Sequence, residues 1–140
     1  MSSICIFGVF VADLCFFGKS IPARGETILG SKHIVGPGGK GSNQAIAAAR
    51  LNGKVNFITK LGKDSNATMA LDLYSQSGVN IDGVIQDPNL STGVAAIMID
   101  ENGHNAINIV SGAAGHLEKE DINKNLEIIK KSKIFLTQLE

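Results

Sequence analysis

The sequence has no excess of charge of either sign. Its 13 lysine and arginine residues balance 13 aspartate and glutamate residues, for a formal net charge of +0. No run of basic residues occurs before the lysines at positions 130, 131 and 133. Because a surface that binds nucleic acid needs a basic stripe, we expect no nucleic acid among the partners.

Cysteine and metal-binding patterns are also scarce. The two cysteines, Cys5 and Cys15, lie in apolar stretches, which predicts buried free thiols in a reducing compartment. The three histidines, His33, His104 and His116, are scattered and have no metal-ligand spacing with either cysteine. The side-chain spacing therefore indicates no metal site.

Long hydrophobic runs are missing as well. The apolar stretch 4–17 contains Asp13, has no basic segment before it and is too short to span a bilayer. This pattern favours a buried first strand over a signal peptide. We therefore expect a cytoplasmic protein without a membrane partner.

What the chain does have is the composition of one globular domain: 140 residues, 44% hydrophobic and 19% charged. Apolar runs predict strands, and helical spacing of apolar residues predicts helices. The predicted strands are 4–9, 31–35, 55–61, 79–85, 92–100, 105–110 and 134–139, and the predicted helices are 45–51, 64–76 and 118–131. This alternation favours an α/β sheet that carries a smaller all-β layer.

Several residues indicate where these elements end. Gly53 and Gly78 are placed to close the first two helices. The pair Asn102-Gly103 between two β-rich runs predicts a hairpin, because both residues tolerate a positive φ. Residues 122, 126 and 129 form the predicted apolar stripe of the third helix.

The most informative segment is GPGGKGSNQA at 36–45, which leads into the alanine-rich helix. Glycines let the backbone approach a ligand closely, and a helix N-terminus directs N–H groups at it. Lys40 adds a charged donor, and Asn43 adds an amide that both donates and accepts. The segment predicts a site for a small, oxygen-rich molecule.

Two nucleotide-binding motifs share features with this segment. Gly36, Gly38 and Gly41 satisfy the dinucleotide pattern G-x-G-x-x-G, which also needs an acidic residue at the end of the next strand. That strand ends in TKLG at 59–62, so a dinucleotide-binding oxidoreductase is the less favoured alternative. A Walker P-loop needs Ser or Thr after the lysine, and Gly41 excludes it.

Four motifs together carry a resemblance to a family. They are GVFVADL at 8–14, PARGET at 22–27, GGKGSNQA at 38–45 and STGVA at 91–95. In this order they resemble ribokinase and the wider PfkB family of carbohydrate and nucleoside kinases. The resemblance implies a ribokinase-like three-layer α/β/α fold with a small β-sheet lid. Residues 1–140 would be the N-terminal portion of that kinase domain, with lid strands at about 20–36 and 91–110.

The resemblance also implies a reaction and a site. ATP with Mg²⁺ would phosphorylate a sugar hydroxyl, and a monovalent cation is a further candidate activator. Asp13 would accept hydrogen bonds from two sugar hydroxyls, and Asn43 would bond others. Gly38, Gly39 and Lys40 would lie against the sugar, and Glu140 matches a family glutamate near it. In this family two lids clasp each other, so we expect a homodimer.

Two departures limit what the resemblance implies. Val11 stands where ribokinase commonly has asparagine, which removes a hydroxyl partner and leaves open which sugar or related polyol binds. The family's Gly-Ala-Gly-Asp segment, with the catalytic base, is expected C-terminal to Glu140. The sequence SGAAG at 111–115 is similar, but His116 follows it instead of an acid, so we predict a loop there.

We therefore expect no catalytic residue within these 140 residues and no phosphorylation by this chain alone. A kinase represented by its sugar-binding half is the favoured interpretation. A non-catalytic sugar-binding or regulatory module is the alternative.

Overall fold

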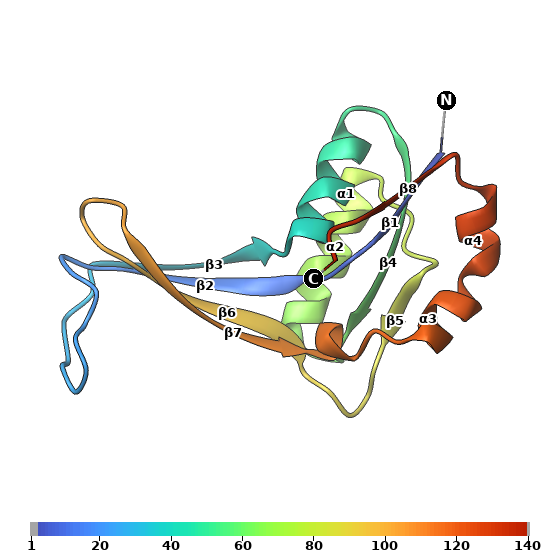
Figure 1. Cartoon of the computed structure of the whole chain (residues 1–140). Helices are drawn as coiled ribbons and strands as arrows, with labels where there is room; N and C mark the ends of the chain where they lie inside the picture. Colours follow the sequence, from blue (N-terminus) through green and yellow to red (C-terminus); the bar gives the residue numbers. More distant parts are fainter. Residues whose placement is uncertain (1–2, 140) are drawn as a thin grey trace.

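A computed structural model describes residues 3–139 of the chain. The first sheet is parallel and has the order β5-β4-β1-β8. Its strands are β1 (Ser3–Phe7), β4 (Lys54–Leu61), β5 (Val84–Gln86) and β8 (Ile134–Thr137). Helices α1 (Lys40–Arg50) and α2 (Ser65–Ser77) lie on one side of it, and α3 (Lys119–Lys124) and α4 (Leu126–Lys131) lie on the other (Figure 1). The predicted α/β/α layering is confirmed.

The main core lies between this sheet and the helices α1 and α2. Ile6, Phe57 and Tyr74 are fully buried there, and the Phe57 and Tyr74 rings meet edge to face with centroids 5.3 Å apart. The buried Tyr74 hydroxyl donates a hydrogen bond to Ser42 Oγ at 2.9 Å. Burial raises the pKa of Tyr74 well above its usual range. This satisfied polar contact ties α2 to the first turn of α1.

The second sheet has the order β3-β2-β6-β7 and projects from the helix-covered sheet as an arm (Figure 1). Its strands are β2 (Val11–Phe17), β3 (Lys32–Gly38), β6 (Thr92–Ile99) and β7 (Asn105–Gly112). Strands β2 and β6 pair in parallel, and the pairs β2–β3 and β6–β7 are antiparallel. The predicted all-β layer is therefore present.

The strand predicted at 4–9 is confirmed as β1, but a second strand in the apolar stretch 4–17 was not predicted. That stretch forms β1 and β2, which belong to different sheets and are separated by residues 8–10. Phe10 in this connection is fully buried, so the stretch stays apolar although the chain changes sheets.

Both cysteines are free: Cys5 is buried, which raises the pKa of its thiol to about 11, and Cys15 is half-buried.

The first helix begins earlier than predicted, at Lys40 instead of residue 45. Gly41 and Ser42 are buried in its first turn, so tertiary packing outweighs the poor helix propensity of glycine. The left-handed residue after the helix is Asn52, with φ of 64°, and not the predicted Gly53.

The prediction of one helix over 118–131 is wrong, because α3 and α4 are separated at Asn125. The Asn125 side chain donates from Nδ2 to the Asp121 backbone oxygen at 2.8 Å, and such local bonds compete with regular helix. Asp121 and Asn125 are buried, whereas Leu126 of the predicted apolar stripe is 38% exposed. In this segment the most buried residues are therefore polar ones that make hydrogen bonds, and not the residues of the predicted apolar stripe.

The predictions for the end of α2 and for the hairpin are confirmed. Helix α2 is closed by Gly78, whose φ is 75°, as predicted, and Asp64, predicted as its first residue, is its N-cap. The hairpin between β6 and β7 is confirmed, although of its two predicted turn residues only Gly103 has a positive φ, at 83°. In place of the strand predicted at 79–85, the chain forms the shorter strand β5 and an isolated bridge at Asn80.

In the part of the chain that the structure describes, no helix is long and apolar enough to cross a membrane.

Candidate functional site

A cavity of about 500 Å³ opens where the two sheets meet. It is lined by the C-terminal ends of β1 and β8, the start of α1, and the strands β2, β6 and β7. Four of the six predicted site residues line it: Asp13, Gly39, Lys40 and Asn43. Gly38 lies directly beside Asp13, and Glu140 is outside the described residues.

Asp13 lies within β2 and is surrounded by small residues. Its neighbours across the sheet are Gly36 on β3 and Ala95 on β6. A Cβ at Gly38 would overlap the Asp13 carboxylate, so a larger residue there would displace that side chain. No residue of 3–139 donates a hydrogen bond to this carboxylate, and burial raises its pKa. The arrangement leaves an acceptor facing a space that a ligand can enter.

The glycine segment packs directly against the connection between β1 and β2. Gly39 has φ of 88°, and a Cβ there would lie 2.5 Å from the Val9 carbonyl oxygen. A Cβ at Gly41 would lie 2.8 Å from the Gly8 Cα. These close approaches place the N-terminus of α1, with Lys40 and Asn43, beside the cavity. The helix dipole there favours oxygen-rich or negatively charged groups.

Apolar side chains surround Asp13 on the same face of the second sheet. Val11 lies two residues before Asp13 on the same face of β2, and both line the cavity. Ala95 pairs with Asp13 on one side and with Ile109 on the other, and Ile107 and Ile97 lie in the next row. The cavity therefore offers hydrogen-bonding groups to one part of a ligand and hydrocarbon to another.

Sequence analysis missed one wall of the cavity, formed by residues 111–117. The predicted loop at 111–115 is the end of β7 followed by a 3₁₀ turn at Ala113–His116. Ser111, Ala114, Gly115 and Leu117 line the cavity. The signal available in the sequence was a run of small residues directly after a strand that ends at this edge.

The structure contradicts the dinucleotide alternative. The pattern requires a strand, a glycine turn and a helix within a parallel βαβ unit. The strand before the glycines, β3, is antiparallel to β2 in the second sheet, whereas the next strand, β4, belongs to the first sheet. Within residues 3–139 there is also no group of three His, Cys, Asp or Glu side chains arranged to hold a metal ion.

Comparison with known proteins adds to this geometry. Residues 1–139 match the pfkB family of carbohydrate kinases. The chain is 39% identical to a deoxyribokinase of Salmonella typhi over 137 residues, which are 98% of this chain and 45% of the relative. It is 34% identical to the ribokinase of Mus musculus, over 99% of this chain and 43% of the relative.

Solved structures agree with these relatives. The ribokinase of Giardia lamblia matches with a TM-score of 0.90 at 32% identity, over 99% of this chain and 42% of that chain. The Arabidopsis thaliana ribokinase complexed with ribose and ATP matches with a TM-score of 0.87 at 31% identity, over 97% and 45%. The chain spans less than half the length of the curated relatives and solved structures described above.

Proposed function

Since the chain belongs to the pfkB family of carbohydrate kinases, we propose that it forms the sugar-binding part of an ATP-dependent sugar kinase. The observation that carries this proposal is the convergence of Asp13, Lys40 and Asn43 on one cavity between two sheets. The cavity volume of about 500 Å³ is ample for a monosaccharide and falls in the usual range for small-molecule sites.

The described residues bind and orient the sugar in this proposal. The ionised Asp13 accepts hydrogen bonds from two sugar hydroxyls, and Asn43 and Lys40 bond others from the start of α1. Gly38 and Gly39 let the backbone lie against the sugar. The second sheet, including β2 and the segments 20–36 and 91–110, acts as the lid that limits water.

Phosphoryl transfer depends on positioning and on charge stabilisation. We propose that ATP and Mg²⁺ serve the whole protein, where the cation neutralises phosphate charge. A monovalent cation remains a candidate activator, and the catalytic base is assigned to none of residues 3–139. The proposal includes a cytoplasmic location and a homodimer formed through the lid.

The sugar itself is proposed to be a pentose that lacks one hydroxyl. Val11, Ile107 and Ile109 line the cavity with hydrocarbon, and a hydroxyl buried against them would have no partner. A relative that is 39% identical is named deoxyribokinase. We therefore favour 2-deoxyribose over ribose.

An ATP-coupled assay tests the proposed activity with the whole gene product and with this 140-residue chain. We expect the whole product to phosphorylate 2-deoxyribose with a kcat/KM about a hundredfold above that for ribose, the discrimination that an apolar pocket gives against an added hydroxyl. The chain described here should bind the sugar without turnover, and robust turnover by it would contradict this division of roles.

A non-catalytic sugar-binding module is the second candidate, because the cavity residues Asp13, Lys40 and Asn43 suit binding of a sugar whether or not a phosphoryl group is transferred. The same assay separates the two functions. A whole gene product that binds 2-deoxyribose but transfers no phosphoryl group from ATP would establish the module and exclude the kinase.

A further inference from the structure

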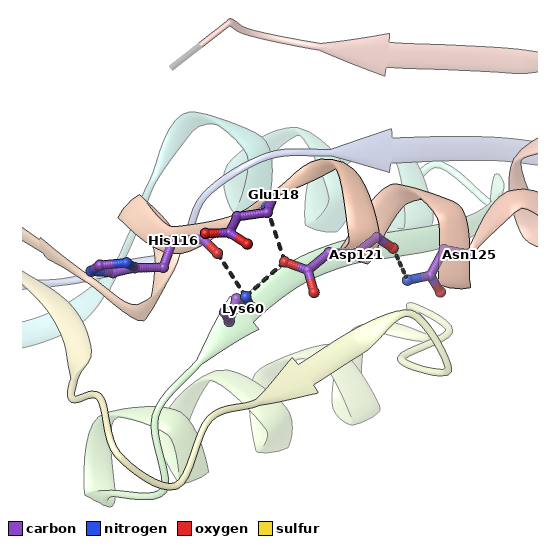
Figure 2. A network of polar contacts seen from close by, with 5 residues as sticks. All are labelled: Lys60, His116, Glu118, Asp121 and Asn125. Atoms are coloured by element: carbon purple, nitrogen blue, oxygen red, sulfur yellow. Dashed lines mark hydrogen bonds and ion pairs between the residues drawn. The ribbon is translucent and has the colours of Figure 1, made fainter.

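A buried ion pair lies behind the wall of the cavity at 111–117. Lys60, near the C-terminal end of β4, places Nζ 2.7 Å from Asp121 Oδ2. The two side chains are only 11% and 5% exposed. The same Nζ donates a hydrogen bond to the His116 backbone oxygen at 2.6 Å (Figure 2). Neither Lys60 nor Asp121 lines the cavity.

Asp121 is held in turn by the start of α3. Its Oδ2 also accepts a hydrogen bond from the Glu118 backbone N–H at 3.0 Å, and its backbone oxygen accepts one from Asn125 Nδ2 (Figure 2). Burial alone would raise the pKa of Asp121, but the bonds from Lys60 and Glu118 outweigh it and lower that pKa. Asp121 is therefore an ionised, fixed anchor for the Lys60 ammonium group.

The wall is fastened at two points. Near its beginning, the Ala113 N–H donates to the Ser91 carbonyl oxygen at 2.8 Å. Near its end, Lys60 holds the carbonyl of His116, which lies between the cavity residues Gly115 and Leu117. A charge-assisted bond to this carbonyl restricts the 3₁₀ turn more than a bond to water would.

We propose that Lys60 and Asp121 are a positioning pair, which fixes the wall at 111–117 and thereby sets the affinity of the cavity for its sugar. Neither residue touches the ligand. The part that concerns affinity rests on the proposed sugar-binding function. The part that concerns the wall rests on the contacts of Lys60 with Asp121 and His116 alone.

A double variant, Lys60→Met with Asp121→Asn, tests the pair in the full 140-residue chain. It removes both charges together, so no unpaired charge is left buried, and the amide oxygen of the new side chain keeps an acceptor for the Glu118 N–H. Lys60→Arg is the conservative rescue, because it keeps the charge and the donors. Lys130→Met is the matched control, because Lys130 pairs with Glu127 at 3.7 Å on an exposed surface.

Two measurements are made on each variant: amide hydrogen exchange of 111–117 relative to β1, and calorimetric affinity for 2-deoxyribose. In the double variant we expect exchange at 111–117 to rise about tenfold and affinity to fall about tenfold. Lys60→Arg and Lys130→Met should behave as the unaltered chain does. If the double variant does not fold, Lys60→Gln with Asp121→Asn replaces it, because this pair also leaves no buried charge and keeps polar groups at both positions; we then expect changes of about threefold in both measurements.

Unchanged exchange at 111–117 in a folded variant would overturn the proposal, and so would faster exchange with unchanged affinity. A merely structural role predicts faster exchange throughout β1 as well, which also overturns it. If the unaltered chain binds no sugar, the proposed function fails, and the exchange measurement still decides whether Lys60 and Asp121 fix the wall.

Discussion

At the scale of single residues, the surroundings of Asp13 decide what the cavity can bind. Its lateral neighbours, Gly36 and Ala95, are too small to cover its carboxylate. Burial raises its pKa, so the folded protein holds a proton on Asp13 at a higher pH than the unfolded chain does. The charged form costs some stability, which the fold regains as the pH falls through the raised pKa. The ionised Asp13 carboxylate thus remains available as a hydrogen-bond acceptor, although its burial lowers the free energy of unfolding.

Asp13→Asn should weaken sugar binding by one to two orders of magnitude, since a charge-assisted bond is worth about 1.5–3 kcal/mol. Calorimetry with 2-deoxyribose at neutral pH measures the loss. In the unaltered chain, affinity should also fall on acidification, beginning above the ordinary aspartate pKa of 3.8. Asp72→Asn, at an exposed position of α2, is the control. Equal affinity of the Asp13 variant and the unaltered chain would reject the assignment.

At the scale of elements, the start of α1 depends on a backbone that only glycine adopts readily. Gly39 combines φ of 88° with the Val9 carbonyl oxygen at 2.5 Å from the position of a Cβ. Gly36, three residues earlier, has no positive φ and has open space around that position. The backbone at position 39 therefore requires glycine, whereas the backbone at position 36 can accept a larger residue.

Gly39→Ala should lower the free energy of unfolding by about 1–3 kcal/mol, because the strained backbone and the overlap both act against it. Gly36→Ala is the matched control and should change the melting temperature little. Thermal unfolding followed by circular dichroism compares the two. Similar melting temperatures for both variants would show that Gly39 carries no special constraint.

Asp64 joins two elements through its carboxylate, and a third through Thr92. Oδ1 caps α2 by accepting from the Ala67 N–H at 2.9 Å, and Oδ2 accepts from the Thr92 N–H of β6 at 2.7 Å. Thr92 Oγ1 in turn accepts from the Gly62 N–H after β4. Burial opposes ionisation, but these bonds outweigh it and lower the pKa of Asp64. The base of the second sheet is thus tied to the first.

Asp64→Ala should cost about 1–2 kcal/mol of stability at neutral pH, the value of a lost cap and its partner bond. Because the folded pKa is lowered, the contribution of the charge is complete above the ordinary value of 3.8 and is lost as the pH falls through the lowered pKa. Asp64→Asn should accordingly differ from the unaltered chain at neutral pH and approach it at a pH of about 2. Urea unfolding at both values measures this, and a gap that stays constant would contradict it.

At the scale of the whole molecule, the second sheet exposes apolar side chains on both faces. Ile34 and Val35 are adjacent on β3 and point to opposite faces, with exposures of 42% and 46%. On β7, Ile109 and Val110 are likewise exposed at 57% and 58%. Such surfaces are typical of association sites.

If the protein forms the proposed homodimer through this sheet, a charge on the contacting face should shift it toward monomer. Ile34→Lys and Val35→Lys introduce the same charge on opposite faces, so each is the other's control. Sedimentation velocity should show a dimer for the unaltered protein and a monomer for one of the two variants. A monomeric unaltered protein, or dimers in both variants, would contradict association through the lid.

The sequence alone determined the features that depend on neighbours within a few residues. Helix α2 lies between Asp64 and Gly78, because a side-chain cap and a left-handed glycine act locally. The resemblance to the family likewise came from short motifs, and it selected Asp13, Lys40 and Asn43 before any distance was known. Local chemistry was sufficient for these.

Tertiary structure alone decided what depends on pairing between distant segments. Asp13 and Ala95 are far apart in the sequence, and only the parallel pairing of β2 with β6 places them side by side. The cavity wall at 111–117 and the early start of α1 arise in the same way, from contacts that no local pattern contains. Propensities and caps act over one or two turns of chain, whereas a cavity forms only where remote elements pack together.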